Sequence, residues 1–166
     1  MLMLRSERQK RNGAALVEFA LLANVYLLVL FGIIEYARFA FTRQIAFNAA
    51  REGVRLAIVR TTSDTNLNAW SSATAATHFI QDRVDEWLFQ QGVNQWSGYD
   101  KRTSIQIYRA DPVTLANIGP WTNAGFGDAI CVQITGTWNS ALLSFVFMGQ
   151  NPVIDVRCVG YCEANL

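Results

Sequence analysis

Apolar residues form a long run near the N-terminus of this chain. Residues 14–34 read AALVEFALLANVYLLVLFGII and contain a single charged residue, Glu18. A helix needs about 20 predominantly apolar residues to cross a bilayer, so this run predicts a transmembrane segment. A secretory signal has an apolar core of about 7–15 residues followed by a small-residue cleavage site, and this run is longer and lacks such a site.

The helical pattern continues after the predicted transmembrane segment. Residues 35–60 contain no proline and a single glycine, and small residues recur there at three- and four-residue steps on one face. This small-residue stripe consists of Ala46, Ala49, Ala50, Gly53 and Ala57. Small residues allow another backbone to approach closely. The stripe therefore predicts helix packing, either on partner subunits or on this chain's own domain.

A second helix is predicted after a polar linker at residues 61–72. Residues 73–91 have the spacing of an amphipathic helix, which Gly92 would end. Its predicted apolar stripe consists of Ile80, Val84, Trp87 and Leu88.

Alternating apolar residues predict three strands, at 104–109, 128–138 and 152–161. The expected fold class is α+β. A long N-terminal transmembrane helix continues into a small extracytoplasmic domain, in which one further helix packs on an antiparallel sheet of about three strands.

Basic residues precede the apolar run and predict its orientation. Arg5, Arg8, Lys10 and Arg11 stand against one acid, Glu7. Such a bias keeps the N-terminus in the cytoplasm and places the rest of the chain outside it. The formal net charge of the whole chain is only +1, which argues against a nucleic-acid partner.

The sequence around Gly13 carries the most specific motif. Residues 10–19 read KRNGAALVEF, and two further parts of the pattern are FGIIE at 31–35 and AAREGVR at 49–55. This pattern resembles the processing site of type IV pilins, in particular the TadE-like minor pilins (pseudopilins) of tight-adherence (Tad/Flp) pili. In that family a basic leader ends in glycine, and the fifth and sixth residues of the mature chain are glutamate and an aromatic residue.

The resemblance implies cleavage between Gly13 and Ala14, which places Glu18 and Phe19 at those two positions. Residues 1–13 would then be a removable leader, with Lys10 and Arg11 just before its end. Residues 14–34 would span the membrane, 35–60 would extend the helix, and 61–72 would link it to an extracytoplasmic domain at 73–166.

The implied function is that of a minor pilin, cleaved by a prepilin peptidase and incorporated in, or required for assembly of, a pilus for surface attachment. The implied partners are the peptidase, other pilins and pseudopilins, the assembly platform in the inner membrane, and membrane lipid. The implied location is the inner membrane, in a single pass, and after assembly the pilus. The alternative is an unprocessed, membrane-anchored extracytoplasmic binding domain.

Glu18 has a physical reason to lie in an apolar helix. Cleavage after Gly13 would create a positive α-amine on Ala14, and Glu18 lies one helical turn further along. A buried ion pair is tolerable where an unpaired buried charge is not. The pair, formed within one chain or between neighbours, would set the register of the subunits.

The remaining chemistry predicts neither catalysis nor a cofactor. The chain has a single histidine, His78, and no nucleophile elbow or phosphate-binding loop, and its cysteines lack the spacing of a zinc site. Strand parity places Cys131 and Cys158 on opposite faces, which disfavours a disulfide between them. The sequence does not decide whether a disulfide forms. The favoured pairing joins Cys158 and Cys162 across a turn at residues 160–161.

An apolar segment at residues 141–149, ALLSFVFMG, is too short to span a membrane. We expect it to fold back as core, with a docking patch for a membrane or another subunit as the alternative.

Overall fold

The computed structural model describes residues 3–59, 73–92, 96–140 and 151–162, and the side chains from residue 13 onward. These residues belong to two compact units, Met1–Arg38 and Phe39–Leu166. The predicted linker at 61–72 and the apolar segment at 141–149 lie outside the described residues.

Helix α1, Met3–Ile58, contributes to both units. In the second unit it is joined by α2, Ala73–Gln90, and by the one-turn helix α3, Lys101–Ser104. Helix α2 is followed by Gly92, which has a φ of 69°. Glycine adopts this left-handed conformation without steric cost, so it is suited to the end of a helix.

The sheet consists of four antiparallel strands in the order β2-β1-β3-β4. Their bounds are Ile105–Ala110 for β1, Asn117–Gly119 for β2, Ala129–Thr137 for β3 and Val153–Tyr161 for β4. A short 3-10 helix, η2, covers Trp121–Asn123. The three longer strands lie within one residue of the predicted positions, whereas the sequence did not predict β2.

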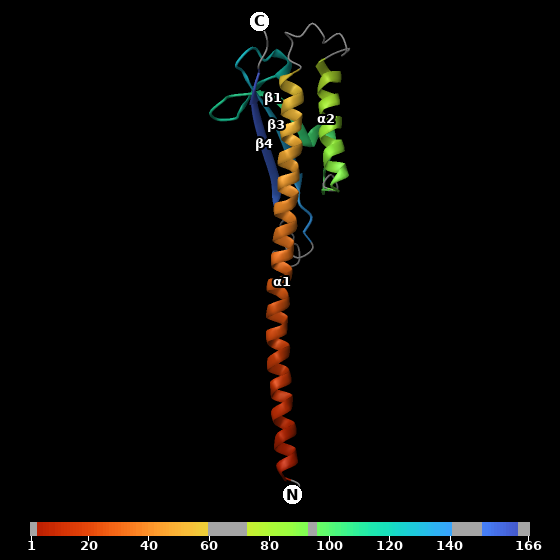
Figure 1. Ribbon diagram of the computed structural model, residues 1–166, viewed down its shortest axis with the longest axis vertical. Coiled ribbons are helices and arrows are strands. Elements are labelled where there is room, and N and C mark those ends of the chain that lie inside the picture. The colour runs from red at the N-terminus through yellow and green to blue at the C-terminus, as the bar shows by residue number, and fades with distance from the viewer. Residues whose placement is uncertain (1–2, 60–72, 93–95, 141–150, 163–166) are drawn as a thin grey trace. The chain divides into compact units, whose positions relative to one another are not determined.

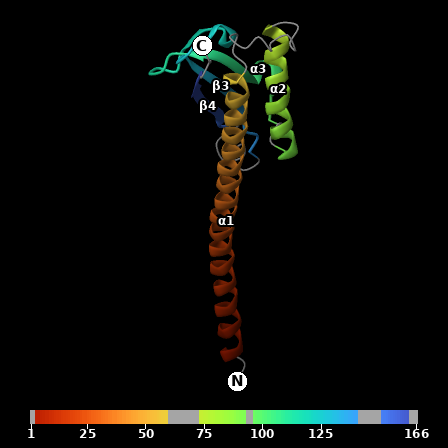
Figure 2. The same ribbon diagram turned by 45° about the horizontal axis from the view of Figure 1, so that its top comes forward.

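The core of the second unit lies between one face of the sheet and the helices α1 and α2 (Figures 1 and 2). The buried residues on this inner face include Ile105, Ile130, Val132, Ile134, Ile154 and Val156. Helices α1 and α2 meet at Gly53, where an added Cβ would lie 2.8 Å from Val84 Cγ2 and 3.3 Å from Val132 Cγ1. The absence of a side chain at Gly53 therefore permits the close approach of helix, helix and sheet.

The small-residue stripe is part of this core. Ala46, Ala49, Ala50 and Ala57 have no exposed surface, and Gly53 is buried with them. Of the two possibilities that the sequence left open, the structure shows packing on the chain's own domain.

The apolar stripe predicted for α2 was wrong at one position. Ile80, Val84 and Leu88 are fully buried, but 47% of Trp87 is exposed. Gln81 is buried instead, because its amide Nε2 donates to the carbonyl of Ile105 at 2.7 Å. A buried amide is tolerated when it is hydrogen-bonded in this way.

Candidate processing and assembly segment

The predicted cleavage site lies within a helix in the first compact unit. Gly13 and Ala14 both have helical backbone and are exposed. Outside the nearby backbone of its own helix, a Cβ added to Gly13 would meet no atom within 4 Å, so no neighbouring part of the described structure crowds this position. A protease needs an extended backbone at this bond, and glycine lowers the cost of unwinding by about 1 kcal/mol relative to alanine.

Glu18 and Phe19 lie on the open surface of the same helix. Glu18 is exposed, and 70% of Phe19 is exposed. Glu18 follows Ala14 by four residues, so the two share one helix face. The structure therefore allows the carboxylate of Glu18 to reach an amine on Ala14. The side chains of Lys10 and Arg11 lie outside the described set.

The predicted transmembrane segment has an apolar surface all around. Its large apolar side chains from Leu16 to Ile34 are exposed. Among the described residues, one helix is long and apolar enough to cross a membrane, at Gly13–Ile58, and it lies near the N-terminus. An ion pair between Arg38 Nη1 and Glu35 Oε2, 3.1 Å apart, follows the apolar run. A helix that is apolar all around needs lipid or partner helices to cover it, as in a single-pass membrane anchor.

None of the three cysteines forms a disulfide in the structure. The disulfide proposed between Cys158 and Cys162 is not formed, because the expected turn at residues 160–161 is the end of strand β4. Four residues of strand cover about 13 Å, and a disulfide needs Cα atoms within about 7 Å. The expected separation of Cys131 and Cys158 is confirmed, since Cys158 pairs with Val132 and Cys131 pairs with Val159. Burial raises the pKa of both the Cys131 and the Cys158 thiol.

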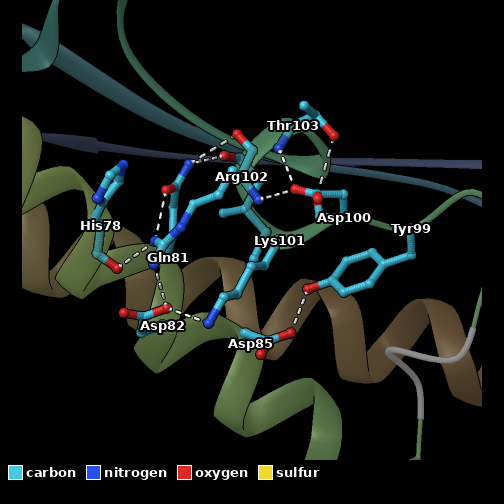
Figure 3. Close-up of polar contacts among 10 residues, drawn as sticks. His78, Gln81, Asp82, Asp85, Tyr99, Asp100, Lys101, Arg102 and Thr103 are labelled. Carbon is cyan, nitrogen blue, oxygen red and sulfur yellow. Dashed lines mark hydrogen bonds and ion pairs between the residues drawn. The ribbon is translucent and has the colours of Figure 1, made fainter.

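A polar network that the sequence did not predict joins α2 to α3 (Figure 3). Asp82 Oδ1 lies 2.8 Å from Lys101 Nζ and 2.9 Å from Arg102 Nη2. Hydrogen bonding from Lys101, and then from Arg102, holds the pKa of Asp82 below its ordinary value. Asp100 caps α3 by accepting from the backbone N–H groups of Arg102 and Thr103. The hydroxyl of Tyr99 donates to Asp85 at 2.8 Å, and burial raises the pKa of Tyr99.

Beside this network lies an open hollow of about 380 Å³. Part of its polar lining is hydrogen-bonded within the protein itself. Arg102 Nη1 donates to the carbonyl of His78 and to Gln81 Oε1, and Trp121 Nε1 donates to Thr77 Oγ1 at 2.9 Å. In the described part of the chain no three His, Cys, Asp or Glu side chains gather as metal ligands. The network is therefore best explained as the link that fixes α2 to the sheet.

Comparison with known families decides the nature of the N-terminal segment. Residues 13–55 match the family model described as TadE-like protein. This part of the chain is TadE-like. The match begins at Gly13, includes Glu18 and Phe19, and ends within the helix that packs on the sheet. The search of curated proteins and the search of solved structures found no match. The TadE-like segment indicates a pilin-like protein associated with tight-adherence pili.

Proposed function

We propose that this chain is a minor pilin or pseudopilin of a tight-adherence pilus. It is made as a precursor, cut after Gly13 by a prepilin peptidase, held in the inner membrane by residues 14–34, and then used in pilus assembly. The observation that carries this proposal is the exposed helix of the TadE-like segment, in which Glu18 follows Ala14 by one turn. The role is structural, and the partners are other pilins and the assembly platform.

Cleavage is tested by the N-terminus of the mature protein. Expressed with a matching prepilin peptidase, the chain should begin at Ala14 by N-terminal sequencing or intact mass. Gly13→Val should accumulate as the full-length precursor, because a branched side chain obstructs the approach of the peptidase. Gly32→Val is the matched control, since Gly32 also lies in α1 with no atom within 4 Å of an added Cβ. It should be processed normally.

Equal processing of Gly13→Val and Gly32→Val would overturn the assignment of the cleavage site. A mature chain that still begins at Met1 would instead support an unprocessed, anchored binding domain.

Assembly is tested at Glu18. Glu18→Gln keeps the size and polarity of the side chain but cannot neutralise the amine of Ala14. It should insert and be cleaved, yet fail to assemble, because an uncompensated charge between apolar helices costs several kcal/mol. Asn24→Gln alters another polar residue of the span and serves as the control. Co-purification with partner pilins at equal levels of mature protein is the measurement, and wild-type recovery of Glu18→Gln would exclude this role.

A further inference from the structure

Strand β4 lies at one edge of the sheet, alongside the C-terminal part of α1 (Figure 1). Among the described residues β4 pairs only with β3, over nine residues from Val153 to Tyr161. The opposite edge is β2, which has only three residues. An edge strand presents a row of backbone N–H and C=O groups that another chain can pair with. The long β4 edge is therefore the better template for an added strand.

One face of α1 borders this edge. An added Cβ at Gly160 of β4 would lie 2.6 Å from Val54 Cγ1 and would also clash with Ile58, so these two residues identify the α1 face next to β4. Arg43 precedes Val54 by eleven residues, and Arg51 precedes Ile58 by seven. These steps are close to three and two turns, so Arg43 lies within about 20° of Val54 around the helix and Arg51 within about 20° of Ile58, on the side of α1 that borders β4. The charge of Arg51 also reaches Cys158 of β4, where it opposes the rise in the thiol pKa.

These two arginines differ from the other cations of the second unit that the structure describes. Ion pairs are formed by Arg55, Arg83, Lys101, Arg102, Arg109 and Arg157. Arg43 and Arg51 are exposed and have no carboxylate within 4 Å among the residues that the structure describes. The guanidinium carbon of Arg51 lies 5.2 Å from the ring centre of Phe47, so a cation–π contact steadies it.

The spacing of the arginines matches that of a strand. Arg43 and Arg51 are eight residues apart, which is about 12 Å along a helix. Four residues of strand cover about 13 Å and return to the same face. A strand added to β4 with carboxylates four residues apart would therefore bring one carboxylate to each arginine. Arginine binds carboxylates through two parallel hydrogen bonds, which adds specificity to this contact.

We propose that the β4 edge, flanked by Arg43 and Arg51, is a docking site for an extended acidic strand of another protein. Main-chain pairing with β4 supplies the affinity common to such complexes, and the two arginines select the acidic sequence. The segments of this chain outside the described residues do not carry the acidic pattern that the two arginines favour. Residues 60–72 and 163–166 each contain one carboxylate, and residues 93–95 and 141–150 contain none. The inference does not depend on cleavage after Gly13.

The probe is a synthetic peptide, VTETVTETV, whose two glutamates share a face and lie four residues apart. It should bind the full chain in lipid nanodiscs, measured by fluorescence anisotropy, and should slow amide exchange in β4 but not in β2. The peptide with lysines in place of the glutamates should not bind. Arg43→Gln and Arg51→Gln should each weaken binding by roughly tenfold, as expected for a hydrogen-bonded charge. Arg83→Gln, which alters an exposed cation on α2, should have no effect.

Three results would overturn the proposal. The first is absence of binding by the acidic peptide, and the second is equal binding of the acidic and the lysine peptides. The third is binding that needs the arginines but leaves the amide exchange of β4 unchanged. That last result would show that the arginines attract anions without adding a strand to the sheet.

Discussion

At the scale of single residues, two glycines of the sheet keep space for larger neighbours. A Cβ on Gly136 would overlap the ring of Trp96, and a Cβ on Gly160 would lie against Val54 and Ile58. Gly160 is therefore needed for the close approach of helix and strand. The sequence alone predicts a turn at Gly160, because a glycine that permits a turn and a glycine that permits close contact look the same in a sequence.

Gly136→Ala should lower the free energy of unfolding by about 1–3 kcal/mol, since overpacking displaces the Trp96 ring. Gly125→Ala is the control, because its added Cβ would meet only Asp128 Oδ2 at 3.9 Å. Denaturant unfolding of both variants in the same detergent makes the comparison. Equal stability of the two variants would mean that Trp96 can move without cost.

Asp82 should make the link between α2 and α3 depend on pH. Its pKa is lowered from 3.8, chiefly by the hydrogen bond from Lys101. A lowered pKa in the folded state stabilises the protein above the ordinary value, and this contribution is lost as the pH falls through the lowered pKa. Asp82→Asn should therefore be less stable than the wild type at neutral pH and equally stable well below pH 3.8.

The side chain of Asp82 is 47% exposed, so screening by water should keep the difference below about 1 kcal/mol. Thermal unfolding of both proteins across this pH range measures it. Glu86→Gln removes an exposed ion pair within α2 alone and is the control. A stability difference between Asp82→Asn and the wild type that persists at acidic pH would show that the carboxylate acts through its shape and not its charge.

At the scale of elements, α1 has two parts whose sequence patterns differ. Its first part is apolar on every side, whereas from Ile45 onward its buried residues are mainly small or branched. The periodicity predicted the helix and its small-residue stripe. It did not reveal what the stripe packs on, because a close-packed neighbour leaves the same pattern whether it belongs to this chain or to another.

Ala49→Leu tests this packing. The enlarged side chain would have to enter a core in which Ala49 has no exposed surface, so it should destabilise the second unit by about 1–3 kcal/mol. Gln44→Leu, at an exposed position of the same helix, should have little effect on stability. Denaturant unfolding distinguishes the two variants. Normal stability of Ala49→Leu combined with failure to bind partner pilins would favour a bundle between subunits.

Strand β2 and the apolar face of α2 show where sequence patterns were insufficient. Strand β2 has only three residues, including an asparagine and a glycine, so its pairing with β1 leaves no alternation to detect. On α2, burial of Gln81 depends on the carbonyl of Ile105, which lies 24 residues away. Partners this distant do not leave a local signal in the sequence. Hydrophobicity alone favours the larger Trp87 as the buried residue.

At the scale of the whole molecule, the sequence predicted the α+β class and the TadE-like segment. The sequence did not predict the boundary between the two compact units, because this boundary falls after Arg38, within α1. Residues from Ala46 to Ala57 complete the core that the sheet and α2 leave open. The extracytoplasmic domain expected at 73–166 is therefore only part of the compact unit.

Two secreted fragments test this division. A fragment that begins at Phe39 should fold, with a cooperative thermal transition, because it contains the entire second unit. A fragment that begins at Ala73 should aggregate, because it exposes the inner face of the sheet that α1 covers. A cooperative transition in the shorter fragment would show that α1 is dispensable for this core.

If the chain is cut after Gly13 as proposed, the helical backbone at Gly13 and Ala14 would affect the timing of assembly. Cutting a helix in its interior creates a new end, where up to four backbone N–H groups lose their carbonyl partners and the aligned dipoles leave about half a positive charge. Glu18, which lies in mid-helix in the precursor, would acquire two sources of positive charge within one turn at the moment of cleavage. A precursor and a mature subunit in the same membrane would thus differ in their attraction for neighbours, and proteolysis would set the time at which each subunit becomes able to join.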